Sequence, residues 1–265
     1  VAMLTTLSQE RVTAELEKLL VGRNPARGLE LLRTTGALDA ILPELADMPD
    51  CEQNRFHKYD VWGHTVATVQ AIDPGDDPRL RRWAALLHDV GKPAVRHVKA
   101  NGEWGFYRHE TVGAELATAM LDRLKLGRRE SQDIVLLVRR HMDRPDPGDA
   151  RSVRRFMKKA EGHWRDLLAL KRADNASHTY DDNAYHDALE AACQRVEDEE
   201  AAILRAESPL SGDDLVAMFG LEPGPWIREI KDRLSAMVLD GELAPADRDG
   251  AERVARRMMK GVAGG

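Results

Sequence analysis

Apolar positions recur along this chain with the spacing of α-helices. From Val112 to Leu124 large apolar residues follow one another at intervals of four, and a similar stripe in residues 131–141 ends at His141. Side chains four residues apart lie on one face of a helix, so each segment has a single face to bury. Comparable stretches precede residue 50 and resume after residue 186. The pattern predicts an all-α protein.

One segment lacks a polar face and runs into chemically distinctive residues. The five residues Trp83–Leu87 are all apolar, and His88, Asp89, Val90, Gly91, Lys92 and Pro93 follow. We expect a helix enclosed by other helices that stops at about Val90, with Gly91 in the left-handed conformation that ends helices. His88 and Asp89 then lie in the last turn, where free carbonyls and the helix dipole favour a cation. The segment predicts a metal site at the end of a buried helix.

A break in the helical pattern lies between Ala94 and Tyr107. Asn101-Gly102 separates two short β-prone runs there, which is typical of a β-hairpin. We expect this small hairpin to be the only β element and its return strand to deliver His109 to the metal site.

A buried His-Asp pair is costly without partners, and further metal-type ligands flank it in sequence. His64 lies upstream, and His109, His141 and Asp174 lie downstream. This order, together with His88-Asp89, resembles the six-ligand form of the HD superfamily of metal-dependent phosphohydrolases. Each flanking residue alone would more often be an ordinary polar side chain, and the ordered set reverses that interpretation.

The resemblance implies a cofactor, a ligand set and a reaction. It implies one or two divalent transition-metal ions (Mn, Fe, Co, Ni or Zn), with Asp89 bridging two ions and acting as a catalytic residue together with Lys92. Lys92 is also expected to bind substrate phosphate, the alternative being a surface lysine. Two cations beside two carboxylates leave an electropositive pocket, which suits phosphate binding and the activation of water. The implied metal ligands are His64, His88, Asp89, His109, His141 and Asp174.

A wider resemblance extends from about Leu7 to Val254. Residues 23–32, 40–45, 57–64 and 212–225 resemble the regions that follow the head domain of bacterial CCA-adding tRNA nucleotidyltransferases and poly(A) polymerases. That head, with its Gly-Ser loop and paired aspartates, has no counterpart among these residues, so nucleotide addition is not expected of them. We predict an N-terminal helical segment (1–50), an HD phosphohydrolase domain (51–206) and a C-terminal helical tail (207–265).

Composition and charge narrow the alternatives. Cys51 and Cys193 lack ligand-like spacing and are expected to be reduced thiols. The net charge of −6 argues against a generally basic nucleic-acid binder. No signal peptide and no membrane-spanning run is visible, so we expect a soluble cytoplasmic protein.

A local basic surface is nevertheless present. Residues 151–172 hold eight basic and two acidic residues. A solvated helix face is the commoner explanation of such a stretch, and an RNA-contacting surface is the alternative.

The leading hypothesis is a metal-dependent phosphohydrolase acting on nucleotide or RNA-terminal phosphates, of the 2′,3′-cyclic phosphodiesterase or phosphatase type that the resemblance implies. The partner is then a nucleotide or an RNA 3′ end, including that of tRNA. Two alternatives are an HD-type mixed-valence di-iron oxygenase, which uses the same six ligands, and a non-catalytic RNA-binding body. The candidate substrate-binding residues are His57, Lys58, Lys92, Arg154, Arg155 and Lys158.

Overall fold

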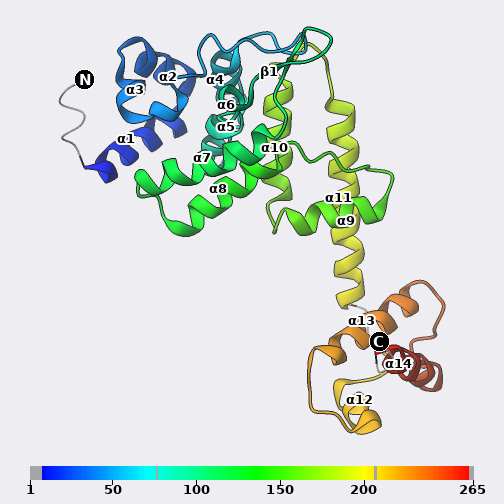
Figure 1. Cartoon of the computed structure of the whole chain (residues 1–265). Helices are drawn as coiled ribbons and strands as arrows, with labels where there is room; N and C mark the ends of the chain where they lie inside the picture. The colour runs from blue at the N-terminus through cyan, green and yellow to red at the C-terminus, as the bar shows by residue number, and fades with distance from the viewer. Residues whose placement is uncertain (1–7, 76, 206–207, 263–265) are drawn as a thin grey trace. The chain divides into compact units, whose positions relative to one another are not determined.

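A computed structural model of the chain describes residues 8–75, 77–205 and 208–262. The chain divides into two compact units, residues 1–193 and 194–265, and the division falls inside helix α11 (Asn183–Arg205). Figure 1 shows the helical elements of both units. The predicted domain limits at residues 50/51 and 206/207 remain predictions.

The first unit is built almost entirely of helices. Its elements are α1 (Gln9–Val21), α2 (Pro25–Thr34), α3 (Ala37–Ile41), the 3-10 helix η2 (Pro43–Leu45), α4 (Val61–Ala71), α5 (Arg79–Leu87), α6 (Lys92–Val95), β1 (His97–Val98), β2 (Trp104–Gly105), α7 (His109–Arg123), α8 (Arg128–Arg140), α9 (Ala150–Lys159), α10 (Trp164–Asn175) and the first half of α11. Among the described residues the only sheet is the antiparallel pair β1 and β2. The predicted fold class, all-α with one small hairpin, is confirmed.

Helix α5 occupies the centre of this unit. It packs against α1, α4, α8 and α10, and every side chain from Trp83 to Leu87 is completely buried. Arg82 is buried as well, and its guanidinium donates to the main-chain carbonyls of Leu20 and Gly22 at the end of α1. A buried guanidinium is tolerated when it is hydrogen-bonded, and here it binds carbonyls that a helix end leaves free. The expectation of an enclosed helix is correct.

The end of α5 differs from the prediction in one respect. The helix ends at Leu87, and Gly91 has φ −79° rather than a left-handed conformation. A Cβ built on Gly91 would lie 2.3 Å from the carbonyl oxygen of His109 and 2.6 Å from the amide nitrogen of Gly113. The glycine therefore permits close approach of α7, and Pro93 stands in the first turn of the short helix α6.

Two other predicted details change. His109 is the first residue of α7 and not part of the return strand. The basic stretch 151–172 forms two helices, α9 and α10, because Glu161 and Gly162 have φ of +50° and +93° between them. The sequence Thr6-Leu7-Ser8-Gln9 has the pattern of a capping box, but Thr6 and Leu7 lie outside the described residues; α1 begins after Ser8.

The second unit has its own apolar core. Helices α12 (Gly212–Phe219), α13 (Pro225–Leu239) and α14 (Arg248–Val262) bury a cluster that includes Leu215, Ile230, Leu234 and Ala251. Ser211 and Asp214 form a reciprocal capping box at the start of α12. No helix in the described part of the chain is long and apolar enough to cross a membrane.

Candidate metal centre

Helix ends bring the six implied metal ligands together. His64 lies in the first turns of α4, His88 and Asp89 follow α5, and His109 begins α7. His141 follows α8, and Asp174 lies in the last turn of α10. Because these five helices converge, residues up to 110 positions apart in the chain face a common point.

The six residues form two clusters of potential ligand atoms. The first cluster is His64, His88 and Asp174: His64 Nε2 lies 3.3 Å from His88 Nε2 and 2.8 Å from Asp174 Oδ1. The second cluster is Asp89, His109 and His141. In it, His109 Nε2 lies 3.1 Å from His141 Nε2 and 3.3 Å from Asp89 Oδ1.

Asp89 connects the two clusters. Its Oδ1 faces His109, whereas its Oδ2 lies 3.1 Å from His88 Nε2 and 3.4 Å from His64 Nε2. One carboxylate thus points an oxygen at each cluster, which is the arrangement a ligand bridging two ions requires. The side chain is buried.

Hydrogen bonds determine which ring nitrogens face the clusters. The Nδ1 atoms of His88, His109 and His141 lie 2.7–2.8 Å from the carbonyl oxygens of Ala85, Phe106 and Val138. A carbonyl can only accept, so each Nδ1 carries a proton and the neutral ring has its lone pair on Nε2.

His64 is oriented in the same way by a serine. Ser177 Oγ donates to the carbonyl oxygen of Asp174 at 3.1 Å and lies 2.6 Å from His64 Nδ1. The hydroxyl has one proton; when that proton is donated to the carbonyl of Asp174, Oγ accepts the Nδ1 proton of His64. All four imidazoles present Nε2 to the clusters.

These donors fit divalent transition-metal ions. Lone pairs that face each other at 3.1–3.3 Å repel unless a cation or proton lies between them, and imidazoles with carboxylates suit Mn, Fe, Co, Ni and Zn. Hydrogen-bonded orientation of the second ring nitrogen is the usual support of a histidine ligand.

The electrostatics agree with a site built for cations. Burial of Asp89 would raise its pKa, but His88 and Lys92 outweigh burial and hold that pKa well below its usual range. Burial opposes ionisation of Asp174 too, yet a hydrogen bond from His64 and positive charge on His88 lower its pKa. In the metal-free site these two rings thus carry a proton on Nε2, at the place that a bound cation would take. Burial, with His109 nearby, lowers the pKa of His141. Two carboxylates are therefore ionised beside imidazoles.

A cavity of about 280 Å³ opens onto the clusters. Asp89, His109, His141 and Asp174 line it, together with basic and aromatic residues. Its remaining lining residues are Asn54, Phe56, His57, Lys92, Lys99, Gly105, Phe106, Met142, His178 and Tyr180.

The expected substrate-binding residues divide into two sets. Lys92 and His57 line the cavity; the Lys92 ammonium lies 2.6 Å from Asp89 Oδ2 and donates to Gln53 Oε1 at 2.6 Å. Lys58 is exposed and does not line this cavity. The basic residues of α9 are also exposed and absent from its lining, namely Arg154, Arg155 and Lys158.

Sequence reasoning missed Ser177, Gln53 and the role of His178. Ser177 and His178 follow Asp174 at i+3 and i+4, which places them beside it at a helix end. The spacing alone therefore indicates that both residues lie near Asp174. Gln53 lies in an irregular segment, where no sequence pattern indicates its contact with Lys92.

Comparison with known proteins agrees with this geometry. Residues 61–178, which contain all six implied ligands, match the family described as HD domain. Residues 61–178 form an HD domain. Residues 1–48, which precede the HD domain, match the family described as probable RNA and SrmB-binding site of polymerase A.

Proteins similar to this HD-domain chain include tRNA enzymes. The chain is 36% identical over 243 residues to an A-adding tRNA nucleotidyltransferase of Deinococcus radiodurans, an alignment covering 88% of this chain and 55% of the relative. It is 35% identical to a CC-adding tRNA nucleotidyltransferase of Thermus thermophilus, covering 86% and 52%. The chain thus spans about half the length of these relatives.

A solved structure shares the fold. The Bacillus stearothermophilus CCA-adding enzyme in complex with CTP superposes with a TM-score of 0.50 at 21% identity, covering 98% of this chain and 54% of that one. The predicted resemblance to the HD and helical regions of such enzymes is confirmed.

Proposed function

We propose that the HD domain is a metal-dependent phosphohydrolase that acts on nucleotide or RNA-terminal phosphates, with a tRNA 3′ end as the favoured substrate. The observation that carries the proposal is the convergence of four imidazole Nε2 atoms and two ionised carboxylates beside one cavity. When bound, divalent ions there supply a Lewis acid and lower the pKa of water. His64, His88 and Asp174 would hold one ion, and His109 and His141 the other, with Asp89 between.

The chain's own residues suit a phosphate. Lys92 and Lys99 add two ammonium groups to the lining of the cavity, beside the clusters. Lys92 is buried and fixed between Asp89 and Gln53, so its charge is held in place for a phosphate oxygen. Fixed positive charge favours an anionic substrate and thus hydrolysis over the oxygenase alternative.

The cavity mouth suits a nucleobase. Phe56 and Tyr180 line the cavity, are 44% and 47% exposed, and contact each other edge to face with ring centroids 6.0 Å apart. Exposed aromatic rings beside a phosphate site are typical stacking surfaces for bases. This favours a nucleotide end over a simple phosphate ester.

The relatives' names support tRNA as the substrate. They are named as A-adding and CC-adding tRNA nucleotidyltransferases, so a module of the same kind that hydrolyses terminal phosphates would act on the 3′ end those proteins extend. Nucleotide addition itself is not assigned to these residues.

The test is hydrolysis by the metal-reconstituted protein. Metal-free protein is loaded with Mn, Co, Ni, Zn or, anaerobically, Fe and assayed on 2′,3′-cyclic nucleotides, nucleoside monophosphates and tRNA with a cyclic or 3′-phosphate end. We expect metal-dependent phosphate release or ring opening that the Asp89→Ala variant lacks. Oxygen consumption by the iron form without hydrolysis would instead support the oxygenase, and RNA binding without turnover would support the non-catalytic body.

A further inference from the structure

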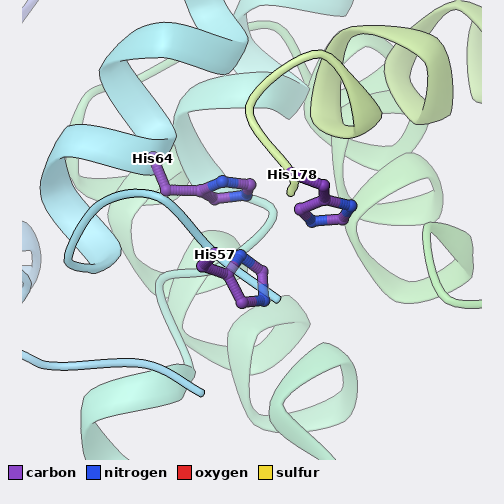
Figure 2. Close-up of side chains that lie close together, drawn as sticks. All are labelled: His57, His64 and His178. Carbon is purple, nitrogen blue, oxygen red and sulfur yellow. The ribbon is translucent and has the colours of Figure 1, made fainter. Parts of the chain in front are cut away.

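A third group of histidines lies at the edge of the metal centre. This rim cluster consists of His57, His64 and His178, whose rings approach one another in Figure 2. The ring centroid of His57 lies 4.8 Å from that of His64 and 4.6 Å from that of His178. His64 and His178 are nearly parallel, with centroids 5.4 Å apart.

The backbone holds the two outer histidines in place. His57 and His178 form an isolated antiparallel β-bridge, and the amide of Thr179 donates to the carbonyl of Phe56 at 3.0 Å. These bonds join the segment before α4 to the segment after α10. The main chain therefore holds His57 and His178 next to each other.

Ring nitrogens in this cluster are buried without hydrogen bonds. His57 Nδ1 and both nitrogens of His178 make no hydrogen bond within the described residues, and His178 Nε2 has only the longer contact of 3.4 Å to Asp174 Oδ1. Leaving a buried polar atom unpaired costs on the order of 1–3 kcal/mol, so such atoms call for a ligand. Imidazole nitrogens are ligands for transition-metal ions and poor ligands for Mg²⁺ or Ca²⁺.

The rim cluster and the first cluster share His64. Because Ser177 accepts the Nδ1 proton of His64, only Nε2 is free to bind an ion, and that atom already faces His88 and Asp174. A single lone pair cannot bind two ions. An ion can therefore occupy the rim cluster or the first cluster, but not both.

The rim cluster is more accessible from the cavity than the first cluster is. His57 and His178 line the cavity, whereas His64 and His88 do not line it and are 0% and 1% exposed. Asp174 lines the cavity and lies between the positions: its Oδ1 is 2.8 Å from His64 Nε2, 3.4 Å from His178 Nε2 and 3.8 Å from His88 Nε2. An ion moving inward could keep His64 and Asp174 while exchanging His178 for His88.

We propose that the rim cluster is the loading position through which a transition-metal ion reaches the first cluster. His57 and His178 capture the ion at the cavity wall, and the shared ligands His64 and Asp174 pass it to His88. The inference rests on the ligand set of the proposed function, but it makes a separate claim about the rates at which metal is loaded and released.

The experiment measures metal exchange in the full chain. Metal-free protein is mixed with Co²⁺ and loading is followed by its visible absorption, and release is followed after adding a chelator. The variants are His57→Gln and His178→Gln, together with His57→Phe and His178→Phe, which keep an aromatic ring but have no ring nitrogen to bind an ion. His97→Gln is the matched control, because His97 is an exposed histidine of the hairpin outside all three clusters.

We expect loading and release to slow by the same factor, about 10-fold, in each rim variant, because a residue on the route lowers the barrier in both directions. The Kd and the two bound equivalents should stay unchanged, which also shows that the variants fold. His97→Gln should match the parent.

Unchanged rates in the rim variants, or a weaker Kd with an unchanged loading rate, would overturn the inference while leaving the proposed function intact. A third equivalent lost on substituting His178 would also overturn it, because the rim would then fill independently of the first cluster. Failure of the parent to bind Co²⁺ would overturn the inference and the proposed function together.

Discussion

Ser177 Oγ accepts a hydrogen bond from His64 Nδ1 across 113 sequence positions, at 2.6 Å. Replacing Ser177 by Ala leaves that buried N–H without an acceptor and frees the imidazole to change tautomer. We expect metal affinity to fall about 10- to 100-fold, the usual size of such losses. Isothermal titration with Zn²⁺ or Co²⁺ measures it.

The control for this variant is Thr68→Val, which removes a buried hydroxyl bonded to the backbone carbonyl of His64 and leaves the ring untouched. Equal losses of affinity in both variants would show that packing rather than ring orientation is responsible.

Lys92 should affect turnover more than metal binding. In Lys92→Met we expect about 10-fold lower turnover of cyclic nucleotides and RNA ends alike, because one fixed charge near the phosphate is lost. Metal affinity should stay equal or rise, since the ammonium 2.6 Å from Asp89 repels cations. Lys58→Met, a change at an exposed lysine outside the cavity lining, should leave both quantities unchanged. A loss of bound metal in Lys92→Met would contradict this role.

Phe56 should contribute to recognition of the base. Phe56→Ala is expected to raise KM for 2′,3′-cyclic AMP about 5- to 100-fold, in line with roughly 1–3 kcal/mol per stacked base. KM for the base-free methyl riboside 2′,3′-cyclic phosphate should not change. Tyr107→Ala removes an aromatic ring that is 79% exposed and does not line the cavity, and it should have no effect on either substrate. Equal changes for both substrates would argue against stacking.

The basic residues of α9 can reach only phosphates distant from the cleaved bond, because none of them lines the cavity. Changing Arg154, Arg155, Lys158 and Lys159 to Gln should spare mononucleotides and weaken tRNA binding. The slope of log K against log salt should become shallower, as fewer counterions are released. Binding of tRNA that is unaltered at low and high salt would identify α9 as a solvated face.

The second unit should lose stability in acid through Asp214. Hydrogen bonds from Ser211, with Arg248 beside it, lower the pKa of Asp214 from 3.8 to about 2. The folded state thus favours the ionised form. This stabilisation is complete above pH 4 and is lost as the pH falls towards 2. Asp214→Asn should remove that part of the pH dependence.

Trp226 is the sole tryptophan of residues 194–265, so ¹⁹F NMR of 5-fluorotryptophan protein isolates the unfolding of this unit. Identical pH dependence in the parent and in Asp214→Asn would exclude the capping box as the source.

The convergence of the six candidate ligands could be predicted from the sequence because these residues occur in motifs. His88 and Asp89 end an apolar run, and His141 continues the apolar stripe of its helix, so local periodicity placed them. The spacing of His178 after Asp174 gave no indication of its β-bridge to His57, 121 residues earlier, and the position of its ring depends on that bridge. Likewise, the close approach that requires Gly91 comes from α7, and nothing in the local sequence distinguishes it from a helix-ending glycine.

The contact at Gly91 also sets a dimension of the candidate metal centre. A Cβ at this position would collide with the main chain of His109 and Gly113, so α7 lies against the turn after Asp89 with no side chain between them. Asp89 and His109 lie on opposite sides of this contact. Contact between main-chain atoms therefore limits how closely the two candidate ligands approach, and no side-chain volume enters that limit.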